Sequence, residues 1–177
     1  MTTVAIARYG AGNVRSVELA LRRLGADLID DLEAADLVIL PGVGSARSAM
    51  EGLGDTADVL RRRHANDRPI LGICLGLQLA LDESEEDGGV AGLGLVPGRV
   101  VRLRGGRIPR IGWAAVEPGD ATFWFAHSYV ADTPNVTATS EGLAAIVEHG
   151  SFTGVQFHPE KSGPAGARFL ESCLSRA

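Results

Sequence analysis

One segment of this sequence has the pattern of a nucleophile elbow, a sharp turn between a strand and a helix that exposes a reactive side chain. The segment is residues 72–76 (GICLG), with Cys74 in the nucleophile position and a glycine two residues away on each side. The glycines leave room for the turn, and a helix that begins after Cys74 favours the thiolate at its positive N-terminal end. On these residues alone, a small buried cysteine at a strand end is an equally good interpretation.

A candidate base and its orienting group lie in residues 157–160 (FHPE). In an extended segment residues two apart point to the same side, so the carboxylate of Glu160 can orient the imidazole of His158. Pro159 biases His158 away from helical geometry, and an oriented base is what a thiol nucleophile requires. By themselves these residues are also typical of a turn at a strand end, but together with Cys74 they favour a Cys-His-Glu triad.

A third segment, residues 41–44 (PGVG), follows an apolar run and is a candidate oxyanion hole. Functional loops of α/β sheets lie at the carboxyl ends of the strands, and glycines permit unusual backbone orientations there. A backbone N–H from this segment, together with that of Leu75, can stabilise the oxyanion of a tetrahedral intermediate. A helix-entry turn is the alternative interpretation.

Other conspicuous segments are better explained without a binding site. Residues 10–15 and 42–47 each begin a G-x-G-x-x-G pattern but end in arginine, which is weak evidence for dinucleotide binding. Residues 61–64 (RRRH) predict a solvated helix face, and the acidic run 83–89 predicts a solvated loop. Cys173 is expected in the core. No histidine and cysteine spacing indicates a metal, and no cofactor is expected.

The elements that position these motifs are predicted by hydrophobic patterning. Apolar runs at residues 4–7, 37–40 and 70–73 predict strands buried on both faces, with a helix after the first run. We expect an α/β fold with a mostly parallel central sheet flanked by helices, additional antiparallel strands in the C-terminal half and an amphipathic closing helix. The strand-like runs of that half are residues 99–103, 122–125, 136–139, 144–147 and 152–157.

Composition restricts the class of protein. The chain has 177 residues, 45% hydrophobic and 22% charged, which predicts one domain over residues 1–177. A net charge of -5 gives no general attraction to nucleic acid or anionic lipid. The longest apolar stretch, residues 69–81, is too short to span a membrane, and the N-terminus lacks a leader pattern. With only two cysteines, a cytoplasmic protein is expected.

Several segments, in order along the chain, resemble the class I glutamine amidotransferases and, within them, the glutaminase subunits of imidazole glycerol phosphate synthase. Related amidotransferases usually carry Pro-Gly-Gly where this chain has PGVG at residues 41–44. PGVG, together with EKS at residues 160–162, therefore favours this subfamily. Where that family usually has PHMGWN, this chain has PRIGWA, with Arg110 and Ala114 as departures near the expected partner surface. The matching segments are YGAGN at residues 9–13, PGVG at 41–44, GICLGLQ at 72–78, HSY at 127–129 and QFHPEKS at 156–162.

The resemblance implies roles for individual residues. Cys74 would attack the carboxamide of glutamine, His158 would relay protons, and Glu160 would orient His158. A glutamyl thioester would form with release of ammonia, and water would then hydrolyse it to glutamate. The remaining implied residues are Val43 and Leu75 at the oxyanion, Gly42, Gly44, Gln78, His127, Ser128 and Tyr129 around glutamine, and Trp113 and Lys161 at the partner interface.

The family delivers its ammonia to a (β/α)8-barrel cyclase in histidine biosynthesis, so the resemblance implies a heterodimer. Such glutaminases are nearly idle until the partner binds its own substrate, which a reorientation of residues 41–44 would explain. Two alternatives stay open at this point. One is a docking module that has lost catalysis, motivated by Arg110 and Ala114; the other is a glutaminase paralogue that feeds a different synthase. His149 receives no role.

Overall fold

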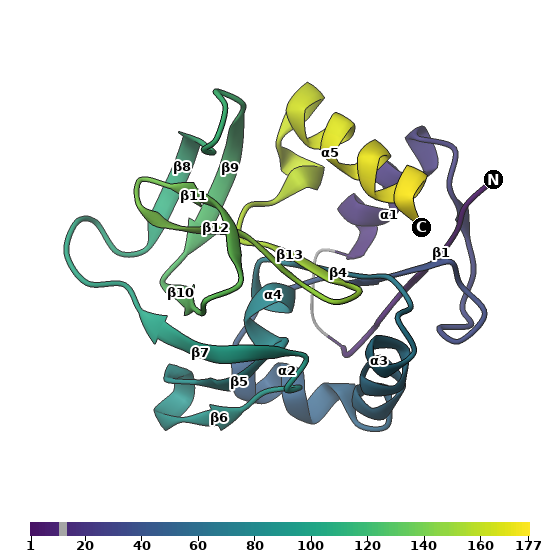
Figure 1. Ribbon diagram of the computed structural model, residues 1–177, viewed down its shortest axis with the longest axis horizontal. Helices are drawn as coiled ribbons and strands as arrows, with labels where there is room; N and C mark the ends of the chain where they lie inside the picture. The colour runs from purple at the N-terminus through teal and green to yellow at the C-terminus, as the bar shows by residue number, and fades with distance from the viewer. Residues whose placement is uncertain (11–13) are drawn as a thin grey trace.

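A seven-stranded sheet lies at the centre of the computed structural model, which describes residues 1–10 and 14–177 (Figure 1). Its strands from β13 to β2 run parallel, whereas β12 and β11 run antiparallel to their neighbours. Residues 11–13 of the segment YGAGN lie outside the described residues. In spatial order the strands are β11 (Val136–Ser140), β12 (Leu143–His149), β13 (Phe152–Val155), β4 (Ile70–Ile73), β3 (Leu37–Leu40), β1 (Thr3–Ile6) and β2 (Asp27–Leu28).

Helices cover both faces of this sheet, as the continuous apolar strands require. Residues of β3 and β4 are all buried, and alternate side chains pack into two separate clusters on the two faces. Helices α1 (Val14–Arg23) and α5 (Gly163–Arg176) cover one face. The other face is covered by α2 (Ala46–Leu53), α3 (Thr56–Ala65) and α4 (Leu75–Leu79) (Figure 1). The predicted fold class is therefore confirmed.

Two smaller sheets stand beside the central one. A four-stranded sheet has the order β10-β7-β5-β6, and β8 pairs with β9 in a two-stranded antiparallel sheet. The predicted strand at 152–157 is shorter than expected, because β13 ends at Val155. The elements of these sheets are β5 (Leu81–Ser84), β6 (Val90–Ala91), β7 (Val96–Arg102), β8 (Arg110–Ala115), β9 (Thr122–His127) and β10 (Tyr129–Asp132), with 3₁₀-helices η1 (Glu86–Gly88) and η2 (Pro159–Lys161).

Two predictions about charged segments are wrong. The acidic run 83–89 is not a plain solvated loop, because its first two residues end β5 and its centre forms η1. The run RRRH is not a fully solvated face, because Arg63 is completely buried. Its guanidinium donates to the backbone oxygens of Leu32 (2.7 Å), Ala35 (3.1 Å) and Pro69 (3.2 Å), so it pairs inward-facing carbonyls at the entry to β3 and β4.

Among the described helices, none combines the length and apolar character that a bilayer span requires.

Gly76 allows α4 to lie directly on β3. A Cβ at this position would lie 1.9 Å from the backbone oxygen of Leu40. We expect Gly76→Ala to lower the free energy of unfolding by more than about 2 kcal/mol, measured by urea denaturation, because neither backbone can move aside cheaply. Gly105→Ala is the control: Gly105 has a φ of +79° and open space around it, so this variant isolates backbone strain of about 1 kcal/mol. Equal losses in both variants would contradict the close approach.

Candidate active site

Cys74 occupies the sharp turn between β4 and α4 that the elbow pattern predicts. Its backbone has φ 53° and ψ -105°, a conformation that residues other than glycine rarely adopt. The backbone N–H of Cys74 donates to the oxygen of Val155 (2.7 Å), and its carbonyl oxygen accepts from the N–H of Leu77 (3.1 Å). The turn is thus held from the neighbouring strand and from the helix that follows.

The thiol of Cys74 lies among polar groups that the sheet brings together. Its Sγ accepts a hydrogen bond from Nε2 of Gln156 (3.5 Å) and lies 3.8 Å from the backbone oxygen of Ala126. His158 lines the same cavity as this thiol and interacts with it electrostatically. Gln156 is fully buried, and its Oε1 accepts from Nε2 of Gln78 (3.1 Å). The sequence analysis gave Gln156 no role, although a polar residue within the apolar run VQF was a usable signal.

His158 and Glu160 form a buried pair next to this thiol. Nδ1 of His158 lies 2.9 Å from Oε1 of Glu160, and their side chains are 4% and 2% exposed. The geometry differs from the expected extended segment, because residues 159–161 form the 3₁₀-helix η2 and the turn carries Glu160 back towards the imidazole. Ser162 holds that turn in place: its Oγ donates to the oxygen of His158 (2.6 Å) and accepts from the N–H of Trp124 (2.9 Å).

The pair raises the basicity of the imidazole. Burial alone lowers the pKa of His158, but hydrogen bonds and charge interactions with Cys74 and Glu160 outweigh burial and raise the pKa from 6.5 to about 9. The protonated imidazole therefore lies beside the sulfur, where a positive charge stabilises a thiolate. The second carboxylate oxygen of Glu160 is buried without a hydrogen-bond partner in the described structure.

The predicted oxyanion segment lies directly against the elbow. A Cβ at Gly42 would lie 2.4 Å from the nitrogen of Gly76, so only glycine allows this approach. Leu75 is the first residue of α4, and its N–H therefore has no acceptor within the helix. The backbone oxygen of Pro41, the first residue of this segment, accepts a hydrogen bond from the hydroxyl of Tyr9 (2.7 Å).

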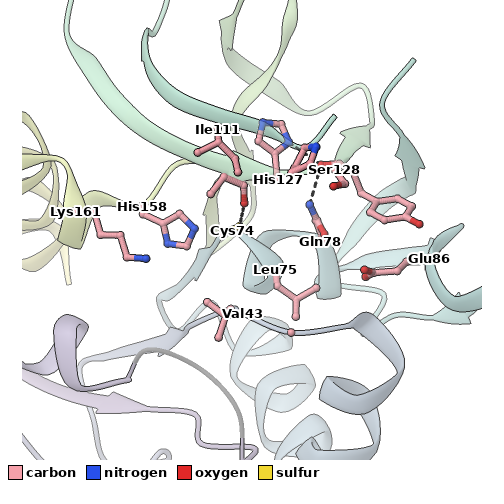
Figure 2. A pocket seen from close by; sticks show the side chains of 15 residues that line it. Val43, Cys74, Leu75, Gln78, Glu86, Ile111, His127, Ser128, His158 and Lys161 are labelled. Atoms are coloured by element: carbon pink, nitrogen blue, oxygen red, sulfur yellow. Dashed lines mark hydrogen bonds between the residues drawn. The ribbon is translucent and has the colours of Figure 1, made fainter. Parts of the chain in front are cut away.

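A cavity of about 350 Å³ opens at the thiol (Figure 2). Almost all of the sequence-predicted residues line it, but Glu160 and Trp113 do not: Glu160 lies behind His158, and Trp113 is 56% exposed on β8. The lining residues are Gly42, Val43, Gly44, Cys74, Leu75, Gln78, Glu86, Pro109, Ile111, Ala126, His127, Ser128, Tyr129, His158 and Lys161.

His127 is neutral and held in one tautomer. Burial is the main cause that lowers its pKa to about 4, and the positive charge of Arg110 acts in the same direction. Nδ1 lies 2.8 Å from the backbone oxygen of Tyr129, which accepts only, so Nδ1 carries the proton and Nε2 is an acceptor. Gln78 donates to the same oxygen from Nε2 (2.9 Å). These side chains thus fix the cavity wall at Tyr129. An imidazole with so low a pKa is unsuited to take up a proton as the general base.

Arg110 points into the protein behind the cavity. Its guanidinium donates to Oγ of Ser140 (2.8 Å), pairs with Glu141 (2.9 Å) and lies 4.2 Å from the ring centroid of Phe125. Nη1 lies 3.4 Å from Nε2 of His127. This departure from the family pattern therefore connects the β8–β9 hairpin to the turn after β11, and the sequence analysis did not anticipate such a role.

Glu86 is the one charged cavity residue among those described that was not predicted; Pro109, Ile111 and Ala126 also line the cavity without a predicted role. Glu86 belongs to η1, and its Oε2 accepts from the backbone N–H of Ala46 at the start of α2 (2.9 Å). Partial burial raises the pKa of this carboxyl group. The acidic run was interpreted as solvated because charge patterning alone does not show that one of its carboxylates lines the cavity.

Residues 1–10 and 14–177 contain no group of three or more histidine, cysteine, aspartate or glutamate side chains placed to hold a metal ion.

Glu160→Gln should lower the pKa of His158 from about 9, because the variant removes a negative charge 2.9 Å from Nδ1. The folded protein binds this proton more tightly than the unfolded chain, so its stabilising effect is complete below pH 6.5 and is lost as pH rises through about 9. Between pH 6.5 and about 9, the free energy of unfolding should therefore fall less in the variant than in the parent protein. An NMR titration of the imidazole nitrogens measures the pKa. The exposed Glu171→Gln is the control, and an unchanged His158 titration in Glu160→Gln would contradict the pairing.

Comparisons with known proteins agree over nearly the whole chain. A family model described as Glutamine amidotransferase class-I matches residues 6–177. The chain is similar to proteins named imidazole glycerol phosphate synthase subunit HisH from Methanothermobacter thermautotrophicus (43% identical, 96% of each chain) and Moorella thermoacetica (44% identical, 97% of this chain and 94% of the relative). It is also 41% identical to imidazole glycerol phosphate synthase hisHF, chloroplastic, of Arabidopsis thaliana, over 98% of this chain and 34% of the plant protein.

Solved structures show the same architecture. A crystal structure described as a glutamine amidotransferase superposes with a TM-score of 0.77 at 22% sequence identity, covering 100% of both chains. The structure of PurLQS from Thermotoga maritima gives a TM-score of 0.77 at 20% identity, covering 99% of each chain. Identities this low are evidence for a shared fold only.

Proposed function

The chain belongs to the class I glutamine amidotransferases, and from this premise we propose that it is the glutamine-hydrolysing subunit of an imidazole glycerol phosphate synthase. Relatives that carry this subunit name are 39% to 44% identical over nearly the full chain. The observation that carries the proposal is the buried pair of His158 and Glu160 at the cavity that the elbow thiol of Cys74 also lines. None of the comparisons favours an inactive docking module.

The chemistry proceeds in two stages. Sγ of Cys74 attacks the carboxamide carbon of glutamine, and the N–H of Leu75 stabilises the oxyanion that forms. The protonated His158 then gives its proton to the leaving nitrogen, the C–N bond breaks, and ammonia leaves a glutamyl thioester. In the second stage His158 takes a proton from water, the resulting hydroxide attacks the thioester, and glutamate leaves as the thiol is restored.

Glu86 is suited to select an amino acid rather than a simple amide. Among the described residues that line the cavity, it is the one carboxylate, and the α-ammonium group of glutamine requires a negative partner. Figure 2 shows its side chain at the end of the cavity beyond Gln78 and Leu75, away from His158. This arrangement supports a glutamine that lies with its carboxamide at Cys74 and its ammonium group at Glu86.

Glu86→Gln should raise the KM for glutamine about tenfold or more, with a smaller effect on kcat. The amide oxygen still accepts from the N–H of Ala46, whereas the attraction to the ammonium group, worth about 1.5–3 kcal/mol, is lost. Steady-state glutamate release measures both constants. Glu85→Gln is the matched control, because the exposed Glu85 accepts from the N–H of Arg102 and does not line the cavity. Equal KM values in the two variants would exclude this role.

The partner in this proposal is a (β/α)8-barrel cyclase that consumes the ammonia. The plant relative supports it, because this chain matches about a third of a single longer protein named hisHF. Exposed apolar side chains near the cavity provide a surface that a partner can cover, namely Val43 (37% exposed), Ile111 (62%) and Trp113 (56%). Lys161 is exposed and lines the same cavity. We place Trp113 and Lys161 in this interface; the cytoplasmic location stays a prediction.

Cys74→Ala should abolish glutamine-dependent synthesis by the assembled complex while synthesis from added ammonium salt continues. The variant removes the nucleophile and leaves the fold and the partner surface unchanged. The measurement is product formation by the complex with each nitrogen source, with the parent complex as control. Loss of both activities would indicate failed folding or docking. Turnover of glutamine by the parent chain without delivery to this cyclase would favour a paralogue that serves another synthase.

A further inference from the structure

A side-chain amide in the protein interior contacts the reactive sulfur, and the two-stage chemistry above does not use it. Nε2 of Gln156 donates to Sγ of Cys74 (3.5 Å). Gln156 is completely buried and is not among the described residues that line the cavity, whereas His158 is. The sulfur is therefore contacted from within the protein as well as from the cavity, and water does not compete for the inner contact.

Neighbouring groups fix which end of the Gln156 amide faces the sulfur. The backbone oxygen of Tyr129 only accepts hydrogen bonds, so Gln78 directs its Nε2 at that oxygen (2.9 Å). The same nitrogen lies 3.1 Å from Oε1 of Gln156 and donates to it. Because its oxygen is turned to Gln78, Gln156 presents its NH₂ group to Cys74, and the opposite orientation would place two donors against each other.

The backbone of Gln156 is held by the strands on both sides of it. Its N–H donates to the oxygen of Ala145 in β12 (2.9 Å). The oxygen of Val155, the residue before it, accepts from the N–H of Cys74 (2.7 Å). The backbones that carry the donor and the sulfur are thus joined directly, so the amide is already in place before any reaction begins.

The two contacts of the sulfur favour different protonation states. The backbone oxygen of Ala126 (3.8 Å) can only accept, so it favours the protonated thiol. The Gln156 amide donates, and such a hydrogen bond is stronger when the acceptor is charged, so it favours the thiolate. The sulfur is negatively charged before it attacks, and again when the C–S bond of the thioester breaks and its electron pair stays on Sγ.

We propose that Gln156 is a further catalytic residue, whose side-chain amide stabilises the Cys74 thiolate both as nucleophile and as leaving group. Gln78, which lines the cavity, is the positioning residue that orients this amide (Figure 2). The effect on turnover rests on the proposed glutaminase function. The contact with the thiolate does not, because it exists in the chain alone and can be measured without glutamine.

Gln156→Met tests this role, because it removes the donor and keeps the length of the side chain. The measurement is the rate of Cys74 alkylation by iodoacetamide as a function of pH, followed by mass spectrometry of the peptide that contains Cys74. The pH at which the rate reaches half its plateau should rise by about one unit in the variant, which corresponds to about 1.4 kcal/mol. An unchanged midpoint would overturn the inference.

Asn135→Leu is the matched control for this measurement. It also removes a side-chain amide that is hydrogen-bonded to a titratable group, in this case Nδ1 of His149 (3.0 Å). Asn135 does not line the cavity, so the alkylation midpoint of Cys74 should stay at the parent value. An equal shift in both variants would mean that the loss of any buried amide moves the midpoint, and the assignment to Gln156 would fail.

A second measurement leaves residue 156 unchanged, so it decides the question even if Gln156→Met does not fold. The side-chain N–H resonances of Gln156 in the parent protein, followed by NMR, should shift with pH at the same midpoint as Cys74 alkylation. Resonances that do not respond, or that respond equally in Cys74→Ala, would overturn the inference.

Turnover separates this inference from the proposed function. In the complex with its partner, Gln156→Met should lower the kcat for glutamine hydrolysis about tenfold with little change in KM, because the amide acts on the sulfur and not on bound glutamine. An unchanged kcat would overturn the catalytic role. If the parent shows no turnover with any partner, the proposed function fails, while alkylation and NMR still decide whether Gln156 stabilises the thiolate.

Discussion

The buried contact between His158 and Glu160 is the constraint on which the site depends. A carboxylate that is 2% exposed with one oxygen unpaired is costly unless a positive charge lies against it, and the imidazolium supplies that charge. The imidazolium stays against the carboxylate only if the turn after β13 is fixed in position. Ser162 and α5 fix it. A Cβ at Gly166 would lie 1.9 Å from the oxygen of Pro159, so the closing helix lies directly on this turn. Stability and acid–base chemistry therefore draw on the same contacts.

The order of strands explains why residues 84 positions apart can meet. Strands β4 and β13 are parallel neighbours, with Ile73 opposite Val155, so their carboxyl ends lie side by side. The nucleophile follows the first strand directly, and the base follows the second after a short extended stretch. The oxyanion segment follows β3, the neighbour of β4 on its other side. Three adjacent strand ends thus supply the nucleophile, the base and the candidate oxyanion donors, as the general rule for open α/β sheets describes.

Sequence reasoning succeeded where chemistry depended on local patterns. The strands at residues 37–40 and 70–73 were predicted to the residue, because parallel strands buried on both faces are continuous apolar runs bounded by proline and glycine. Prediction from the sequence failed where the hydrogen-bond partner of a polar side chain lies far away along the chain. Arg63 looked solvated because its carbonyl partners lie outside the helix, and Glu86 looked solvated because its cavity forms only when η1 packs near α2. The resemblance brought the cavity residues together, but it did not indicate that Tyr9 is hydrogen-bonded to Pro41.

The oxyanion segment lies between two separate hydrogen-bond systems. On one side the hydroxyl of Tyr9 donates to the backbone oxygen of Pro41 (2.7 Å). On the other, α2 begins at Ala46 without a side-chain cap from Ser45, and its first N–H groups are instead paired by η1: Glu86 accepts from Ala46 (2.9 Å) and Asp87 accepts from Arg47 (3.2 Å). Both systems are formed by side chains of other segments, so the position of the oxyanion segment depends on Tyr9 and η1 as well as on its own glycines.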